Sequence, residues 1–304
     1  MKVLIAGGTG LVGTHLTNLL AAEGHACEVV SRRPNVGIDW DQDALLAGVE
    51  SVDAVVNLAG AGIFDHRWSV AYRREILESR VECTRRLAEA CAAVGGRRLV
   101  SSSAVGYYGP RDMTELGEDA PAGDDFLARV CVAWERALDP AREAGSSAAC
   151  VRIGVVLASD GGALKKMKRP FQLCLGGALG SGKQPSAWVH VTDLCRLFLF
   201  LLEHPELEGA FNGAAPGCVD QRTFARTLGR VLHRPAILPA PAVALRVLLG
   251  GVAQVLLTGQ NAVPRRALEA GFVFEHPHLQ GALENLVGRL AAVVEAPRRP
   301  RGGF

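Results

Sequence analysis

Hydrophobic and polar positions alternate along the first 160 residues in two rhythms, short β-branched runs and longer helical stretches. The apolar runs KVLIAG, ACEVV, DAVVNLAG, RRLVSSS and AACVRIGVVL are typical of buried strands. Between them, residues 11–24, 68–95 and 125–145 have the periodic apolar spacing of amphipathic helices. Strands that alternate with helices predict parallel βαβ units with right-handed crossovers. We therefore expect an α/β fold, a Rossmann-type doubly wound parallel sheet.

The rhythm changes after Leu157. Residues 158–187 are rich in glycine and interrupted by proline, whereas 188–205 return to a strand and a helix, with Thr192 or Asp193 as the expected N-cap. Residues 209–216 predict one more short strand, and 218–295 are mainly helical.

These patterns predict two domains. We expect a dinucleotide-binding Rossmann domain at 1–160, to which 188–216 return. Residues 161–187 and 217–295 would form a smaller, mainly helical C-terminal substrate domain. The tail, 296–304, combines proline, glycine and charge without an apolar face, which is typical of disorder.

The most apolar stretch of the chain is PAVALRVLLGGVAQVLLTG, at 241–259. Arg246 and paired glycines interrupt it, so it is too short and too broken for a membrane span of about 20 apolar residues. We expect a buried helix pair instead. The apolar start of the chain is also too short for a signal peptide.

Composition narrows the function classes further. A net charge of +2 offers no global field to attract nucleic acid or a membrane surface. The 8 cysteines are scattered without a C-x-x-C pair, a pattern that predicts reduced thiols in the cytoplasm and neither disulfides nor a metal site. We expect a cytoplasmic monomer or homodimer whose partner is a small molecule.

Glycines crowd the first loop, where Gly8, Gly10 and Gly13 satisfy G-x-G-x-x-G directly after a strand and at the start of a helix. In that context the pattern predicts a dinucleotide site: one glycine allows the turn, the next lets a pyrophosphate approach, and the last packs helix on strand. The residues that we expect to contact the cofactor lie at the ends of the first strands: Gly7, Thr9, Gly10, Leu11, Val12, Gly13, Ser31, Arg32, Arg33, Leu58, Ala59, Gly60 and Ser102. Arg80, on the helix at 68–95, either contacts the cofactor from beside the cleft or lies on a solvated or paired helix face.

The end of the second strand indicates which dinucleotide. An NAD site usually has Asp or Glu there, which binds the ribose 2′-hydroxyl. This strand ends in Ser31, Arg32 and Arg33. Guanidinium groups suit a phosphate through bidentate bonds, so the sequence predicts NADP(H).

Four motifs in order, GGTGLVG, NLAG, SSSAVGYYG and WVHVTDL, resemble the extended, sugar-nucleotide-epimerase-like branch of the short-chain dehydrogenase/reductase superfamily. ILESRVECTRRLAEA, VRIGVVLASDGGAL and GQNAVPRRALEAGFVFEHP narrow the resemblance to an atypical subgroup called epimerase family proteins, from residue 1 to about 292. The resemblance implies an NADP(H)-binding Rossmann domain and a catalytic Ser, Tyr and Lys, the last two as Y-x-x-x-K on a helix.

Only the serine of that set is present, as Ser103. The helix that should carry Y-x-x-x-K reads FLARVCVAWE, with Phe126 or Leu127 in place of tyrosine and Val130 or Cys131 in place of lysine. No lysine occurs between residues 3 and 164.

Substitutes for the missing pair are few. We expect Ser103 to polarise a substrate oxygen, with Tyr107 or Tyr108 on the following loop as proton donor. The alternative is that one tyrosine packs under the loop and the other only faces the cleft. His190 either stabilises the junction between domains or acts as a general acid.

Three functions remain open. The first is an NADP(H)-dependent, epimerase-like oxidoreductase with a nonstandard proton donor and a carbonyl or sugar-like substrate. The second is a non-catalytic NADP(H)-binding sensor or interaction protein. The third, a sugar-nucleotide epimerase proper, needs a large anion site that the sequence does not display.

The first testable prediction concerns cofactor choice. NADPH should bind at least about tenfold more tightly than NADH, and changing Arg32 and Arg33 to Ala should remove most of that difference, roughly 1.4 kcal/mol. Titration calorimetry with both nucleotides measures the ratio. Equal affinities for the wild-type protein would refute the assignment.

Overall fold

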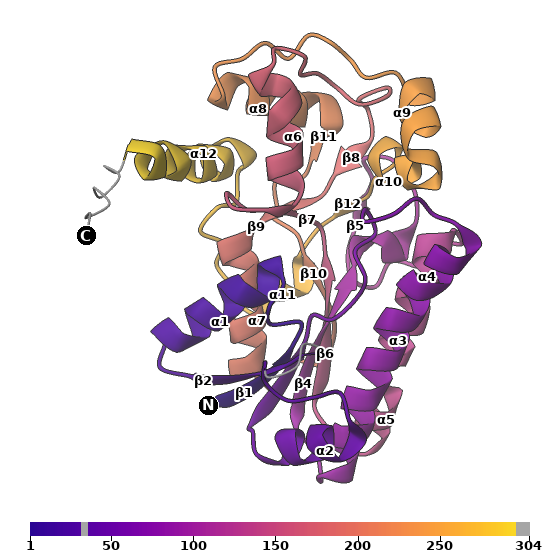
Figure 1. The fold of residues 1–304 in the computed structure, drawn as a ribbon, viewed down its shortest axis with the longest axis vertical. Coiled ribbons are helices and arrows are strands. Elements are labelled where there is room, and N and C mark those ends of the chain that lie inside the picture. The colour runs from indigo at the N-terminus through magenta and orange to yellow at the C-terminus, as the bar shows by residue number, and fades with distance from the viewer. Residues whose placement is uncertain (32–35, 296–304) are drawn as a thin grey trace, which may run out of the picture.

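The computed structural model describes residues 1–31 and 36–295, and within them a six-stranded parallel sheet forms the centre of the molecule (Figure 1). The strand order is β10-β6-β4-β3-β1-β2, and every neighbouring pair is parallel. The strands are β1 (Lys2–Ala6), β2 (Ala26–Val30), β3 (Ala54–Asn57), β4 (Arg98–Ala104), β6 (Ala148–Ile153) and β10 (Gly209–Gly213). The order reverses between β1 and β3.

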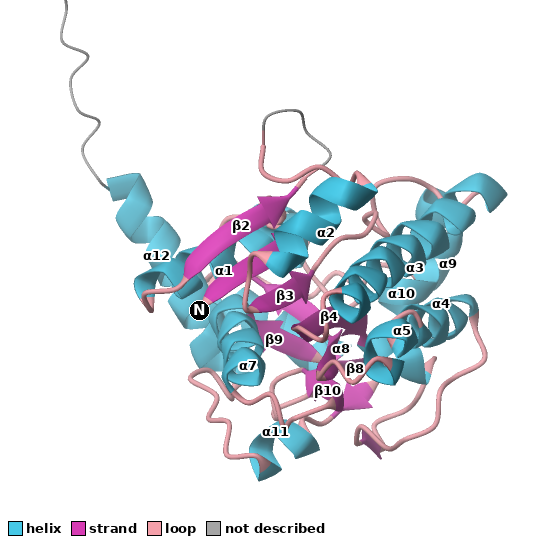
Figure 2. Ribbon diagram, turned by 90° about the horizontal axis from the view of Figure 1, so that it is seen from below, coloured by secondary structure: helices cyan, strands magenta, loops and turns pink. Residues whose placement is uncertain are grey.

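Helices cover both faces of this sheet (Figure 2). In β1, Val3 and Ile5 face the core shared with α1 (Leu11–Ala22) and α7 (Val191–Glu203). Leu4 and Ala6 face the opposite core. That second face is covered by α2 (Gln42–Glu50), α3 (Val70–Ala93) and α5 (Asp139–Glu143), with α4 (Phe126–Arg136) packed beside α3. Because both faces are buried, the strands are mostly apolar runs without a strict alternation of apolar and polar residues. The predicted doubly wound fold is confirmed.

One of the strands predicted from the sequence is divided into two strands in the structure. The run at 148–157 divides at Gly154 into β6 and β7 (Val155–Leu157), and β7 leaves the central sheet to pair with β9 (Trp188–His190). A Cβ at Gly154 would lie 2.7 Å from the carbonyl oxygen of Ala187, so the chain can cross here only as glycine.

The C-terminal part has a core of its own, at the top of Figure 1. Phe171, Trp188, Phe224 and Leu283 are buried together there. The elements of this part are α6 (Gly162–Gln172), β8 (Pro185–Ser186), β11 (Val219–Asp220), α8 (Gln221–Val231), α9 (Ala242–Leu249), α10 (Ala253–Leu257), β12 (Asn261–Ala262), α11 (Arg265–Glu269) and α12 (Leu279–Glu295). β12 pairs with β5 (Glu115–Leu116), which ties this part to the loop after β4.

The expectation of a buried helix pair at 241–259 is wrong for its first helix. Val243, Val247 and Leu248 on α9 are 69%, 70% and 68% exposed. The helix packs onto α10 and the turn before it, Arg67 donates to the carbonyls of Val247 and Leu248, and no residue of α9 is buried in the described part of the chain. Within residues 1–31 and 36–295, no helix is long and apolar enough to cross a membrane.

The expected N-cap of α7 is also wrong. His190, not Thr192 or Asp193, caps the helix, because its Nδ1 accepts the amide hydrogen of Thr192 at 3.1 Å. The Asp193 carboxylate instead accepts the amides of Glu275 and His276 at 2.8 and 2.9 Å, which holds the segment before α12 against the start of α7. The predicted tail at 296–304 lies outside the described residues.

A matched pair of substitutions tests this burial pattern. Val56→Ala, at 0% exposure in β3, should lower the free energy of unfolding by about 2 kcal/mol through lost packing and a residual cavity. Val247→Ala on α9 should change it by less than about 0.5 kcal/mol. Denaturant unfolding measures both, and a large loss in the α9 variant would show that α9 is covered in solution.

Candidate functional site

The glycine-rich loop lies at the carboxyl edge of the sheet, between β1 and β3, where the strand order reverses. Open α/β sheets bind ligands at such a switch point. The amide of Leu58 donates to the Ala6 carbonyl at 2.8 Å, so the ends of β1 and β3 are level. Gly7 has φ +79°, and a Cβ there would lie 2.7 Å from the Leu58 carbonyl carbon. The turn after β1 therefore requires glycine for the fold itself.

Gly10 is different, because the fold does not require it. Its backbone is extended, with φ −78° and ψ 176°, and a Cβ would meet only the Gly7 carbonyl oxygen at 3.3 Å. The residue is exposed, and in the described chain no side chain caps the N-terminus of α1 that it begins. An uncapped helix N-terminus with an open approach is an anion site. Leu11, Val12 and Gly13 form the first turn, beside exposed Thr9.

The exposed N-terminus of α1, with Gly10 before it, forms a cradle for an anion. The far wall of this cradle comes from the segment between β7 and α6. A Cβ on Gly161 or Gly162 would lie 2.9 or 2.8 Å from the Leu11 side chain, so this segment packs directly on the start of α1. His15 and Asp160 hold the same junction at 3.1 Å. The sequence alone did not place these two segments together.

The expected 2′-phosphate site follows β2. Ser31 is buried, and its amide donates to the carbonyl of Ile38 at 2.9 Å. Arg32 and Arg33 lie outside the described residues. Their role therefore stays a prediction.

Beyond β3, the chain passes through Leu58, Ala59 and exposed Gly60, and the Ala59 amide donates to Asn57 Oδ1 at 3.1 Å. The side chain of Arg80, from α3, lies against Gly60. These expected cofactor residues are thus neighbours on the β3 side of the loop. Ser102, in β4, is 6% exposed.

On α4, the structure decides which residues face the loop after β4. A Cβ on Gly106 would lie 3.5 Å from Leu127 Cβ and 3.8 Å from Cys131 Sγ. Phe126 and Val130 pack toward α3 instead. The residues in place of the tyrosine and lysine are therefore Leu127 and Cys131, and burial raises the pKa of the Cys131 thiol to about 12.

The Ser103 hydroxyl is hydrogen-bonded to a buried ion pair. Its hydroxyl donates to Glu135 Oε1 at 2.7 Å, and the Glu135 carboxylate also pairs with Arg152 through Nε at 2.8 Å and Nη2 at 2.9 Å. Burial alone would lower the pKa of Arg152, but the hydrogen bonds and charge of Glu135 raise it. A carboxylate held in this way only accepts hydrogen bonds, so the Ser103 proton is used inside the protein. The donor role expected for Ser103 is not available in this arrangement.

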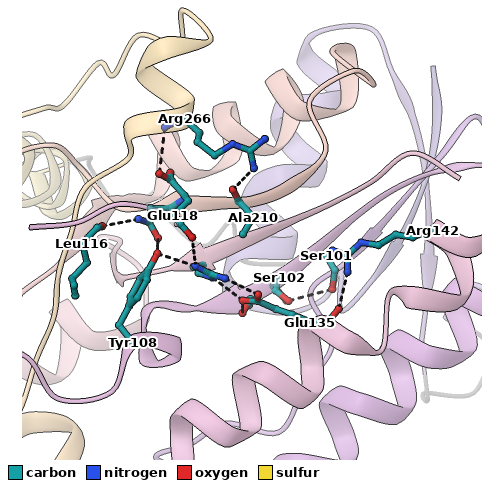
Figure 3. Close-up of polar contacts among 12 residues, drawn as sticks. Ser101, Ser102, Tyr108, Leu116, Glu118, Glu135, Arg142, Ala210 and Arg266 are labelled. Carbon is teal, nitrogen blue, oxygen red and sulfur yellow. Dashed lines mark hydrogen bonds and ion pairs between the residues drawn. The ribbon is translucent and has the colours of Figure 1, made fainter. Parts of the chain in front are cut away.

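Tyr108 is part of the same network (Figure 3). Its side chain is 0% exposed; its hydroxyl donates to Asn212 Oδ1 at 2.7 Å and accepts from Arg152 Nη1 at 3.0 Å. Burial raises the pKa of Tyr108 to about 12. Because no part of the side chain reaches the surface, Tyr108 cannot touch a substrate in this conformation, which corrects its place among the expected proton donors.

Tyr107 is half-buried, and its ring lies under the Arg152 guanidinium, with Cζ 3.4 Å from the ring centroid. Ser103, Tyr107 and Tyr108 thus all meet Arg152, directly or through Glu135. The structure buries Tyr108 under the loop, and the role of Tyr107 toward a substrate stays a prediction.

Four residues of this network were not expected from the sequence. Glu118, at 9% exposure, accepts the Asn212 and Arg266 amides, and its carbonyl accepts from Arg152, so that Glu118, Glu135, Arg152 and Asn212 form one assembly (Figure 3). The sequence does contain one signal for this assembly. Arg152 is the only charged residue in the apolar run AACVRIGVVL, and a charge in a buried strand needs a partner.

Comparison with known families matches two models to the chain. The model of the "NAD dependent epimerase/dehydratase family" matches residues 3–212, which hold almost the whole sheet. A "Domain of unknown function (DUF1731)" matches residues 240–286, from α9 into α12.

Individual relatives are similar over nearly the whole chain. The epimerase family protein SDR39U1 of Bos taurus is 42% identical, covering 94% of this chain and 100% of the relative. Epimerase family protein MT2273 of Mycobacterium tuberculosis is 39% identical, covering 92% and 96%. The crystal structure of human epimerase family protein SDR39U1 (isoform2) with NADPH superposes with a TM-score of 0.88 at 39% identity, covering 95% of this chain and 99% of that chain.

The difference between Gly7 and Gly10 yields a test. Gly10→Val should abolish measurable NADPH binding, because a branched side chain fills the approach to the α1 N-terminus, while the melting temperature changes little. Gly7→Val should lower the melting temperature strongly, because its Cβ would overlap Leu58. Gly281→Val, at a position with nothing within 4 Å, is the control for both measurements. Normal NADPH binding by Gly10→Val would contradict the phosphate cradle.

Proposed function

Because the chain belongs to the NAD dependent epimerase/dehydratase family, and within it to the epimerase family proteins, we propose that it is an NADP(H)-dependent oxidoreductase acting on a small hydroxyl or carbonyl compound. The observation that carries the proposal is the cradle at the switch point, where exposed Gly10 opens onto an uncapped α1 N-terminus. The NADPH named in the human SDR39U1 structure supports the choice of cofactor.

The residues present fit a dinucleotide in this crevice. The amides of Leu11, Val12 and Gly13 would hold the pyrophosphate, and Ser31, Arg32 and Arg33 would hold the 2′-phosphate. Leu58, Ala59, Gly60 and Ser102 would line the β3 and β4 side. When bound, NADP(H) supplies the hydride donor or acceptor, and residues 161–187 and 217–295 would enclose the substrate.

The substrate contact that we propose is the Ser103 hydroxyl, used as an acceptor. Its proton is donated to Glu135, so only its lone pairs are available to a ligand, and because the residue is 2% exposed it meets a substrate only after a local rearrangement. Turning the hydroxyl toward a carbonyl would break a charge-assisted hydrogen bond, which costs about 1.5–3 kcal/mol. Ser103 therefore favours the hydroxyl of an alcohol, and Tyr107, which unlike Tyr108 is only half-buried, is the phenol that we propose beside it.

This proposal is tested with alcohols and ketones of matched shape. Oxidation of alcohols by NADP⁺, followed by the absorbance of the reduced nicotinamide, should be detectable, and Ser103→Ala should lower kcat/KM by roughly 10². Ser101→Ala is the matched control: it removes a hydroxyl from the same strand, at 0% exposure, and should change kcat/KM by less than about twofold.

Two results would count against it. Full turnover in Ser103→Ala would remove Ser103 from the site. NADPH binding without turnover of any alcohol or ketone would favour the non-catalytic sensor instead.

A further inference from the structure

The C-terminal part, at the top of Figure 1, exposes several large apolar side chains that its own core does not use. They come from the end of α6, from the two segments that follow α6 and precede α9, and from α9 itself. A folded chain rarely exposes large apolar side chains on adjoining segments unless they bind something. The side chains, which we call the apolar patch, are Leu173, Leu175, Ile237, Leu238, Val243 and Val247.

The segments that carry the patch lie side by side. The amide of Leu238 donates to the carbonyl of Gly176 at 3.1 Å, so residues 236–241 run along residues 173–180. The amide of Gly180 donates to the carbonyl of Ala240 at 2.9 Å, and α9 begins two residues later. The patch is therefore one region of the surface, although its residues are far apart in the sequence.

The backbone holds this region in a costly conformation. In the part of the chain that the structure describes, the only residues other than glycine with a positive φ are Cys174, at +58°, and His233, at +53°. Cys174 lies between Leu173 and Leu175, and His233 begins the segment that leads to Ile237. A left-handed residue with a Cβ costs about 1 kcal/mol or more, and such strain is concentrated at functional surfaces.

The charge around the patch has one sign. Residues 161–187 and 221–264 contain 10 Lys and Arg and no Asp or Glu, whereas the rest of the chain contains 23 Lys and Arg and 31 Asp and Glu. The net charge of +2, from which no attraction to a membrane was expected, averages over this difference. Three exposed arginines lie within the patch: Arg169 one helical turn before Leu173, Arg234 before Ile237, and Arg246 between Val243 and Val247.

Apolar side chains among cations, with no carboxylate in the same segments, are complementary to the surface of an anionic bilayer. The apolar groups enter the boundary between headgroups and acyl chains, and the guanidinium groups meet lipid phosphates. A bilayer needs no shape-matched groove to accept two loop segments and a short helix. A second copy of the chain would bring the same arginines against these, and like charges in an interface repel.

We infer that the apolar patch docks the protein on the surface of a membrane that contains anionic lipids, with α9 in the interface and Arg169, Arg234 and Arg246 on lipid phosphates. The docking is peripheral, because the side chains that enter the bilayer belong to loops and one short helix. The inference goes beyond the proposed function and depends on neither the cofactor nor the substrate.

Vesicle flotation with the full chain tests it. The protein should bind vesicles of phosphatidylcholine mixed with phosphatidylglycerol, should not bind phosphatidylcholine alone, and should dissociate as the salt concentration rises. Val243→Asp should weaken binding at least about tenfold, because it removes an inserted side chain and adds a charge of the wrong sign. It lies in the first turn of α9, where a carboxylate favours the helix, so the fold should survive.

Two further variants separate the charge from the apolar contact. Arg246→Gln keeps the apolar side chains and should weaken binding about fivefold. Val273→Asp is the matched control: Val273 is 71% exposed and Val243 is 69% exposed, but Val273 lies outside the patch, before α12. It should change vesicle binding by less than about twofold.

Three results would overturn the inference. The first is a wild-type protein that does not bind the anionic vesicles, or that binds them equally well as Val243→Asp. The second is self-association, measured by analytical ultracentrifugation, that Val243→Asp abolishes, which would assign the patch to a second copy. The third is salt-sensitive binding to polyglutamate without binding to vesicles, which would assign the cations to an acidic protein.

Discussion

The buried ion pair between Glu135 and Arg152 is the interaction on which the arrangement of this site depends. Removing one member of such a pair leaves an uncompensated buried charge and typically costs 3–5 kcal/mol, or about half of a small domain's stability. Here the pair joins α4 to β6, and Arg152 also contacts both tyrosines of the loop after β4. Ser103 is fixed by the same carboxylate. The sheet, helix and loop around the serine are thus held by one charge cluster.

This cluster explains how the chain keeps the superfamily's serine without its tyrosine and lysine. Leu127 has no ionisable group, the Cys131 thiol is buried and uncharged because burial raises its pKa to about 12, and Tyr108 is enclosed in the protein. What remains is a serine whose hydroxyl donates to Glu135 and can serve a ligand only as an acceptor. The polar groups around it come from β4 and the loop that follows, with α4 contributing through Glu135.

Most of the fold could be predicted because strands, helices and tight turns are determined by residues that are close together in the sequence. The apolar runs that alternate with helical stretches predict the buried strands of the sheet. The glycines after β1 predict the tight turn at Gly7. The cap of α7 is local but was missed because histidine is not among the residues preferred as N-caps. The other errors arose where distant residues decide: α9 is apolar, yet none of its residues is buried in the described chain. The partners of Ser103 and Tyr108 lie 32 and 104 residues away, so no spacing pattern predicts them.

The direction of the hydrogen bond between Ser103 and Glu135 decides how the serine can meet a ligand, and neutron diffraction from crystals of the deuterium-exchanged protein measures it directly. We expect a deuteron on Ser103 Oγ, directed at Glu135 Oε1, and no deuteron on the Glu135 carboxylate. A deuteron on that carboxylate, or one on Ser103 directed away from Glu135 into the crevice, would contradict it.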